Sequence, residues 1–143
     1  MNNNYKYSLL YNKFLIGLMK NGKKSSVNKV SKKLLRLIKF KGKNPYLIVY
    51  KAINNVKPLF DIKIVRRGKR NIIEKPMLLL HENKKNSLAI KWLIEAAKKG
   101  KSNNFHDNLV EVLFEASDNK GEVKNKQKEL HKRVLLNKTR FTI

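Results

Sequence analysis

The chain changes its periodicity at one place, residues 59–80, which read LFDIKIVRRGKRNIIEKPMLLL. Apolar residues occupy every second position from Phe60 to Ile64, and they return from Ile72 to Leu79 after the basic run at 66–70. Alternation is typical of β-strands, and two such runs around a short glycine-containing segment predict a hairpin. Strands of seven or eight residues reach roughly 25 Å. We therefore expect a β-hairpin finger over about 59–80, with a strongly basic tip.

On both sides of this stretch the apolar residues recur every three or four positions, which predicts helices. Asn44-Pro45 has the form of a helix N-cap followed by proline at the first helical position, and Ser25 or Ser26 could cap the helix before it. The sequence thus predicts a mainly α fold, one domain over 1–143, with six helices and the hairpin inserted between the third and the fourth. The expected helices span about 8–20, 25–42, 45–57, 85–99, 105–117 and 122–136, the last strongly basic.

The charge of the chain is extreme and uneven. Lys and Arg number 34 against 10 Asp and Glu, so the formal net charge is +24 on 143 residues. Residues 1–60 hold no acidic residue, whereas residues 87–119 are nearly neutral. We expect a self-sufficient core in the near-neutral part and a polyanion against the rest: RNA, DNA or an anionic membrane.

Several functional classes find no support. The chain has no Cys, which excludes disulfide scaffolds, Cys-ligated metal centres and cysteine nucleophiles. Its three histidines lie far apart, and Glu111 and Glu115 are one turn apart with no nucleophile beside them. The segment Gly22-Lys23-Lys24-Ser25 lacks the earlier glycine and the strand of a phosphate-binding loop. We expect no enzyme activity, no cofactor, no metal and no membrane span.

Three binding classes remain at this point. A helix-turn-helix DNA reader concentrates its contacts on one recognition helix, whereas cations here occur on the first two helices, the hairpin tip and the last helix. A membrane-active protein needs one dominant amphipathic helix, but the apolar residues are shared among six. The distribution favours folded RNA contacted by shape. A basic DNA-binding or nucleoid-type protein is the alternative.

Several blocks, in order, resemble one family. They are MKNGKKS at 19–25, AINNVKP at 52–58, RR at 66–67, LAIKWLIEAA at 88–97, HK at 131–132 and NK at 137–138. Together these blocks resemble the ribosomal small-subunit protein seven family, of bacterial or organellar type, over about 9–140. The resemblance implies a structural constituent of the small subunit that binds ribosomal RNA, nucleates the subunit head on the 3′ major domain and lies near the tRNA exit site and the messenger path.

The resemblance also assigns residues. It implies partners in small-subunit ribosomal RNA, exit-site tRNA, mRNA and neighbouring proteins of the head and platform. Arg66, Arg67, Lys69 and Arg70 would form the finger near tRNA and mRNA. Trp92 would anchor the fourth helix in the core. The implied ribosomal RNA contacts are Lys20, Lys23, Lys24, Lys32, Lys33, Lys91, Lys98, Lys99, Lys101, His131, Lys132, Arg133 and Lys138.

The chain differs from the family pattern at three places. The basic arm before the first helix is almost absent, the paired glycines of the hairpin tip read Lys69-Arg70, and the ending reads TRFTI at 139–143. Lys outnumbers Arg 28 to 6, and Asn occurs 18 times, which is the residue usage of an A/T-rich genome. Because the resemblance begins within the first dozen residues, we expect no cleavable presequence. The hypothesis is a product of a mitochondrial genome, with a plastid or bacterial cytoplasm as the alternative.

Overall fold

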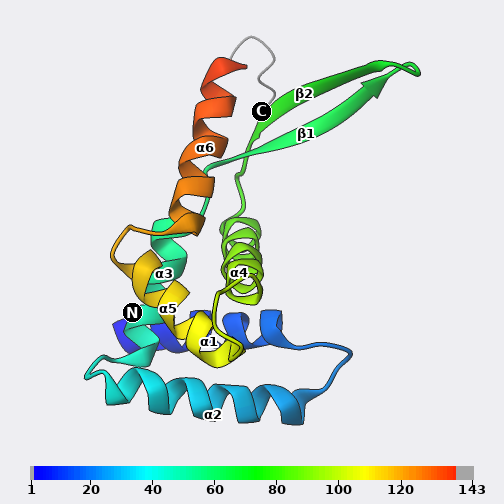
Figure 1. The fold of residues 1–143 in the computed structure, drawn as a ribbon. Helices are drawn as coiled ribbons and strands as arrows, with labels where there is room; N and C mark the ends of the chain where they lie inside the picture. The colour runs from blue at the N-terminus through cyan, green and yellow to red at the C-terminus, as the bar shows by residue number, and fades with distance from the viewer. Residues whose placement is uncertain (1, 138–143) are drawn as a thin grey trace.

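The computed structural model describes residues 2–137 and confirms the mainly α fold with an inserted hairpin (Figure 1). The described part holds six helices, with the two strands between the third and the fourth. The elements are α1 Asn3–Leu18, α2 Lys24–Phe40, α3 Pro45–Val56, β1 Phe60–Arg67, β2 Asn71–Leu78, α4 Glu82–Lys98, α5 Phe105–Ser117 and α6 Glu122–Leu136.

The helix starts were the least accurate part of the sequence prediction. α1 begins at Asn3, and α2 begins at Lys24 with Lys23 at its N-cap, so a cap at Ser25 or Ser26 is wrong. The reason is a tight turn in which Asn21 and Gly22 have φ values of 52° and 69°. The N-cap therefore falls at Lys23, two residues before Ser25.

The N-cap predicted for α3 is confirmed. The Asn44 side chain accepts a hydrogen bond from the backbone N–H of Tyr46 at 3.1 Å, and Pro45 is the first helical residue. Proline costs nothing there, because the first N–H groups of a helix have no partner within it. The helix bounds of α5 and α6 also agree with those expected.

The core lies where α3 crosses α1, α4 and α5. It extends beyond residues 87–119, the near-neutral part in which we expected it. Val49, Ala52, Ile53 and Val56 of α3 are completely buried. They belong to one cluster with buried residues of α1, α2, α4 and α5. The central helix therefore comes from a part of the chain without a single acidic residue, because the lysines of that part lie off its buried face.

Some apolar residues of the helices do not face the core. Leu9 of α1 and Tyr46 of α3 are 45% and 39% exposed. In α4, Ile90, Ile94 and Ala97 are buried, whereas Trp92 and Ala96 only pack against the edge of the core. The Lys126 ammonium lies over the Trp92 ring, 5.1 Å from its centre. Trp92 therefore connects α4 to α6, whereas we expected it to anchor α4 in the core.

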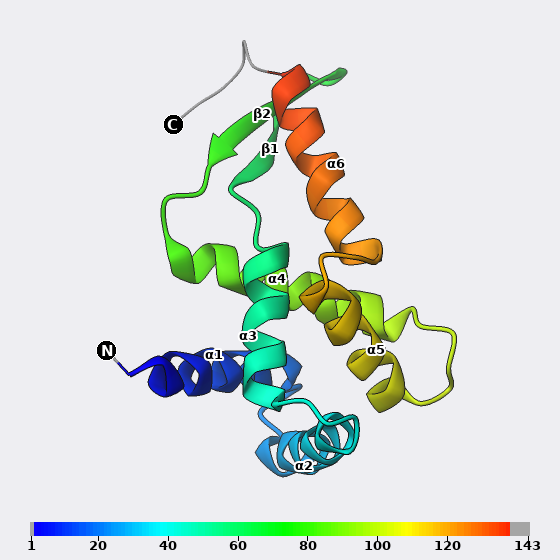
Figure 2. The same cartoon turned by 90° about the vertical axis from the view of Figure 1, so that its left-hand side faces the viewer.

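The hairpin extends away from the helices at the end opposite α1 and α2 (Figures 1 and 2). Its antiparallel register runs from Phe60↔Leu78 to Arg67↔Asn71, which leaves a loop of Gly68, Lys69 and Arg70. Gly68 has a φ of 74° and supplies the left-handed residue that such a loop needs. The expected alternation of burial fails toward the tip, where Ile64 is 62% and Ile72 64% exposed.

α6 fixes the base of the hairpin. The Gln127 side chain donates to the Lys57 carbonyl at 2.8 Å, and His131 Nε2 accepts from the Leu59 N–H at 3.2 Å. Next along α6, Arg133 forms an ion pair with Glu74 of β2. Gln127 is 8% exposed. The finger therefore starts from a fixed position.

The His131 contact should make the fold sensitive to acid. Burial and the Lys124 ammonium lower the pKa of His131, and burial and Lys33 lower the pKa of His106. The unfolded histidines bind protons more tightly, so the stabilisation is complete above about pH 6.5 and is lost as the pH falls through the lowered folded pKa values. We expect a lower Tm at pH 5 than at pH 7.5 by circular dichroism. A smaller drop is expected for His131→Gln, which keeps an acceptor but does not titrate. An equal drop in both proteins would contradict this role.

Candidate nucleic-acid interface

α1 and α4 pack closely at Gly17. A Cβ placed on Gly17 would lie 2.6 Å from Ile90 Cγ2, so only glycine allows this approach without a shift. On the two sides of the contact the surface is hollowed, with volumes of about 590 and 490 Å³. Gly17, Ile94 and Lys98 border both hollows, which are therefore neighbours.

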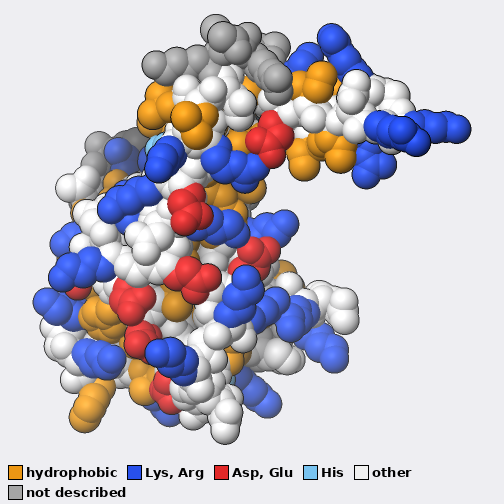
Figure 3. Space-filling model, turned by 45° about the horizontal axis from the view of Figure 1, so that its top comes forward, with side chains coloured by type: hydrophobic (Ala, Val, Ile, Leu, Met, Phe, Trp, Pro, Cys, Tyr) orange, Lys and Arg blue, Asp and Glu red, His pale blue; other side chains and the backbone are white. Residues whose placement is uncertain are grey.

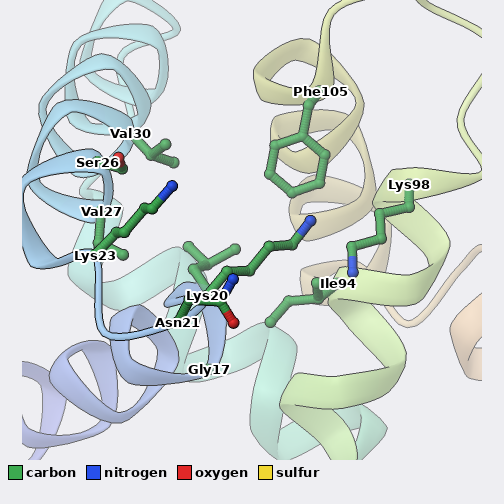
Figure 4. Close-up of a pocket in the computed structure, with 11 residues that line it drawn as sticks. Gly17, Lys20, Asn21, Lys23, Ser26, Val27, Val30, Ile94, Lys98 and Phe105 are labelled. Carbon is green, nitrogen blue, oxygen red and sulfur yellow. The ribbon is translucent and has the colours of Figure 1, made fainter.

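The larger hollow, named here the lysine hollow, brings together cations from two distant segments. Lys20 and Lys23 come from the α1–α2 turn, and Lys98 comes from the last turn of α4. Figure 4 shows Lys20 and Lys98 extending toward each other beside the ring of Phe105. No Asp or Glu is among the described residues that line it. The other lining residues are Gly17, Leu18, Asn21, Ser26, Val27, Val30, Ile94 and Phe105.

The smaller hollow extends the cationic surface along α4. Lys13, Lys91 and Lys98 border it together with Glu95. Lys13 donates to Asn83 at 2.5 Å, and Glu95 lies 3.5 Å from Lys126 of α6. The structure thus places Lys91 near Lys98, while Lys24 lies at the start of α2 beside Lys23. Among the predicted RNA contacts, Lys20, Lys23, Lys91 and Lys98 therefore border two neighbouring hollows.

The α4–α5 turn holds two more of the predicted lysines in a different setting. Lys99 and Lys101 border a third hollow, of about 260 Å³, which also contains Glu111, Glu115 and Glu122. Nearby carboxylates reduce the local positive potential. Lys99 and Lys101 are therefore weaker candidates for phosphate contacts than Lys98.

Asn108, which the sequence analysis missed, organises that turn. It is buried, donates to the Ser102 carbonyl at 2.8 Å and accepts from the Ser102 N–H at 3.1 Å. Asn55 acts similarly at the other end of α5, where it donates to the carbonyls of Ala116 and Ser117. No sequence pattern predicts that one side-chain amide will form two hydrogen bonds with the backbone. The one available hint was that Asn55 lies within the block AINNVKP.

The remaining predicted contacts are spread over other surfaces. Lys32 and Lys33 are exposed on α2, and Lys132 is exposed on α6. His131 and Arg133 already contact Leu59 and Glu74, so their shown role is to position the hairpin. Lys138 lies outside the described residues.

The hairpin tip carries the second cationic surface. Arg66, Arg67, Lys69 and Arg70 are all exposed, and none of them forms an ion pair with a residue in 2–137. Figure 3 shows Lys and Arg side chains at the end of this arm, separated from the body by a deep indentation. The tip and the lysine hollow lie at opposite ends of the molecule, so they can contact different ligands at once.

Substitution of Gly17 should disturb the lysine hollow. Overpacking of an added methyl group costs about 1–3 kcal/mol, while alanine gains up to about 1 kcal/mol in helix propensity. We expect Gly17→Ala to lose about 1 kcal/mol of unfolding free energy in urea and to bind RNA more weakly. Asn12→Ala, at an exposed position of the same helix, should change neither quantity appreciably. An unchanged Gly17→Ala protein would show that the helix contact is not tight.

Residues 2–137 contain neither a cluster of metal ligands nor a membrane-spanning helix. No cluster of three His, Asp or Glu residues there is arranged to hold a metal ion. The described helices are also too short or too polar to span a bilayer. The exposed lysine and arginine side chains of the described surface can bind anions.

Comparison with known proteins agrees with this chemistry. Residues 1–138 match the family described as Ribosomal protein S7p/S5e. Small ribosomal subunit protein uS7 of Rickettsia bellii is 36% identical over 133 residues, 92% of this chain and 80% of the relative. The proteins of the same name from Rickettsia canadensis and Rickettsia felis are 36% and 34% identical over 132 residues, covering 92% of this chain and 81% and 82% of the relatives. The chain therefore belongs to the ribosomal protein S7 family, whose members are structural, non-enzymatic proteins of the small ribosomal subunit.

Proposed function

We propose that residues 1–143 form a single ribosomal RNA-binding domain that binds the 3′ major domain of the small-subunit RNA and nucleates assembly of the subunit head. The observation that carries this proposal is the lysine hollow, where three lysines from two segments meet with no acidic residue among those that line it. Phosphate contacts of this kind fix the position of a protein on folded RNA.

The proposed RNA surface continues beyond the hollow. Lys91 extends it along α4, and Lys24, Lys32 and Lys33 extend it along α2. Lys99, Lys101, Lys132 and Lys138 are outlying contacts, and His131 and Arg133 add to RNA binding mainly through the orientation of α6 and the hairpin. A surface spread over several helices fits an RNA with several helical segments.

The hairpin has a separate proposed role beside exit-site tRNA and the mRNA path. Its support is the projection of four exposed cations at the end of the molecule away from the lysine hollow (Figure 1). Charges at the end of a long arm add little to the docking of the body, but they reach a ligand at a distance. Arg66, Arg67, Lys69 and Arg70 are the proposed contacts.

Neighbouring head and platform proteins are proposed as further partners. Tyr5, Leu9 and Ile16 are large apolar residues of α1 that are 61%, 45% and 63% exposed. Exposed apolar residues of this size are typical of surfaces that another macromolecule covers. A helix that is apolar on both faces is expected to be covered on both.

The test is competition at about 0.15 M salt, where non-specific contacts are already weakened. Labelled 3′-domain RNA is challenged with excess duplex DNA and with unrelated RNA of equal length. We expect only unlabelled 3′-domain RNA to compete. Equal competition by duplex DNA would favour the alternative, a basic nucleoid-type protein.

The role of the hairpin is tested on the same RNA. Neutralising Arg66, Arg67, Lys69 and Arg70 should leave binding to the 3′-domain RNA within a few-fold and should reduce tRNA occupancy of the exit site in reconstituted subunits. Loss of head assembly in that variant would contradict the division between body and finger.

We propose that the protein is encoded by a mitochondrial genome. The family supports a location on the ribosome, without specifying the organelle. The support for a mitochondrial genome is the excess of Lys and Asn, residues with A/T-rich codons. The relatives named above are bacterial. The proposal predicts an A/T-rich organellar gene and co-sedimentation of the protein with mitochondrial small subunits. A nuclear gene, or sedimentation with cytoplasmic ribosomes alone, would contradict it.

A further inference from the structure

The lysine hollow has two parts of different chemistry. The exposed Lys20, Lys23 and Lys98 form its rim, and the buried Val27 and Ile94 with the half-buried ring of Phe105 form its apolar part, called the floor (Figure 4). Its volume of about 590 Å³ lies within the range of about 300–1,000 Å³ that small-ligand sites occupy. A phosphate alone would use the rim and leave the apolar floor empty. The hollow therefore fits a ligand with an anionic part and a flat apolar part.

The start of one helix adds to the positive potential of the rim. Ser26 lies in the first turn of α2, which has no acidic residue and no side-chain cap. Free N–H groups at a helix start attract anions. Phe105 is the first residue of α5, but the first turn of that helix carries Asp107, so we count only the start of α2 in support of the site.

Asn21 and Ser26 add polar groups to the lining of the hollow. Both are exposed, and an amide and a hydroxyl can each donate and accept hydrogen bonds. The edge of a nucleobase presents the matching donors and acceptors, whereas an acidic peptide offers carboxylates and no flat ring. The combination of ring, polar edge and cations favours a nucleotide over a peptide.

We propose that the lysine hollow receives one unstacked nucleotide of the bound RNA, with its base on the face of Phe105 and its flanking phosphates on Lys20, Lys23 and Lys98. This inference rests on the proposed function, because it assumes that the chain binds RNA. Proteins that recognise single-stranded RNA stack splayed-out bases on aromatic rings in this manner. The nucleotide would come from a loop or bulge, since a base within a duplex cannot reach the floor.

The test compares a five-nucleotide oligoadenylate with an abasic strand of the same ribose-phosphate length, by fluorescence anisotropy at about 0.15 M salt. Stacking of one base leads us to expect about ten-fold tighter binding of the base-bearing strand to the unaltered protein. Phe105→Leu, which retains an apolar side chain, should bind both strands equally. Phe114→Leu is the matched control on α5, because its ring lies beneath Lys41 and not in the hollow. It should keep the ten-fold preference.

The position of the strand is read from amide chemical shifts. Titration with oligoadenylate should shift the amides of Ser26 and Phe105, and free adenosine monophosphate should shift them only at much higher concentration. Equal binding of the two strands to the unaltered protein would overturn the base site, as would equal loss of preference in Phe114→Leu. Tighter binding of an Asp/Glu-rich peptide would also overturn it. The proposed function would survive each of these results as long as 3′-domain RNA still resists competition.

Discussion

Replacement of Lys20, Lys23 and Lys98 by glutamine should weaken binding to the 3′-domain RNA about a hundred-fold at 0.15 M salt. Each lysine lost costs about 1 kcal/mol once screening is considered, and about 1.4 kcal/mol corresponds to a factor of ten. The slope of log K against log salt should fall by about 0.7–0.9 for each phosphate contact removed. Filter binding over a salt series measures both quantities.

A matched control separates position from charge. Lys39, Lys43 and Lys51 are exposed and do not line either hollow beside Gly17, and their replacement by glutamine removes the same charge. We expect this control to lose only a few-fold in affinity. Equal losses in the two triple variants would show that the RNA senses total charge and not the lysine hollow.

Phe14→Ala should have the largest effect on stability. Phe14 of α1 is completely buried in the main core. Truncation of a buried phenylalanine costs about 3–5 kcal/mol, out of a total that is about 5–15 kcal/mol for an ordinary domain. The variant should unfold at much lower urea concentration by circular dichroism. Saturating 3′-domain RNA should restore part of the lost stability, because it binds the folded form.

Leu9→Ala is the control on the same helix. Leu9 is 45% exposed, so its truncation should change the unfolding free energy by about 0.5 kcal/mol or less. The two residues are equally apolar in sequence, and only the structure distinguishes them. A loss of several kcal/mol in Leu9→Ala would show that α1 is oriented differently from the structure.

The sequence predicted the order of elements because each signal is local. Alternation over Phe60–Ile64 specifies strands, Asn44-Pro45 specifies a helix start, and spacing of three and four residues specifies helices. These patterns depend on the backbone geometry of a few neighbouring residues. The hairpin between the third and fourth helices was correct for that reason. The predicted start of α2 was wrong because the turn formed by Asn21 and Gly22, which have positive φ values, lets the helix begin earlier, at Lys24.

The charged residues of the candidate site were also predicted, but their arrangement was not. The resemblance to the ribosomal family named Lys20, Lys23 and Lys98 one by one, without showing that they border one hollow. Phe105 was not selected at all, because a lone aromatic residue at a helix start has no distinctive pattern. Asn108 was missed because its partners are backbone groups of Ser102.

The sequence by itself determined a helical, strongly cationic chain with one basic hairpin, and it predicted a polyanionic partner. Only the tertiary structure decided which faces are buried and which cations meet. Leu9 and Phe14 differ in burial because α3 and α4 pack on one side of α1 alone. Lys20 and Lys98 share a hollow because Gly17 lets α1 approach Ile90 of α4. Such contacts join residues more than 70 positions apart, and no local periodicity records them.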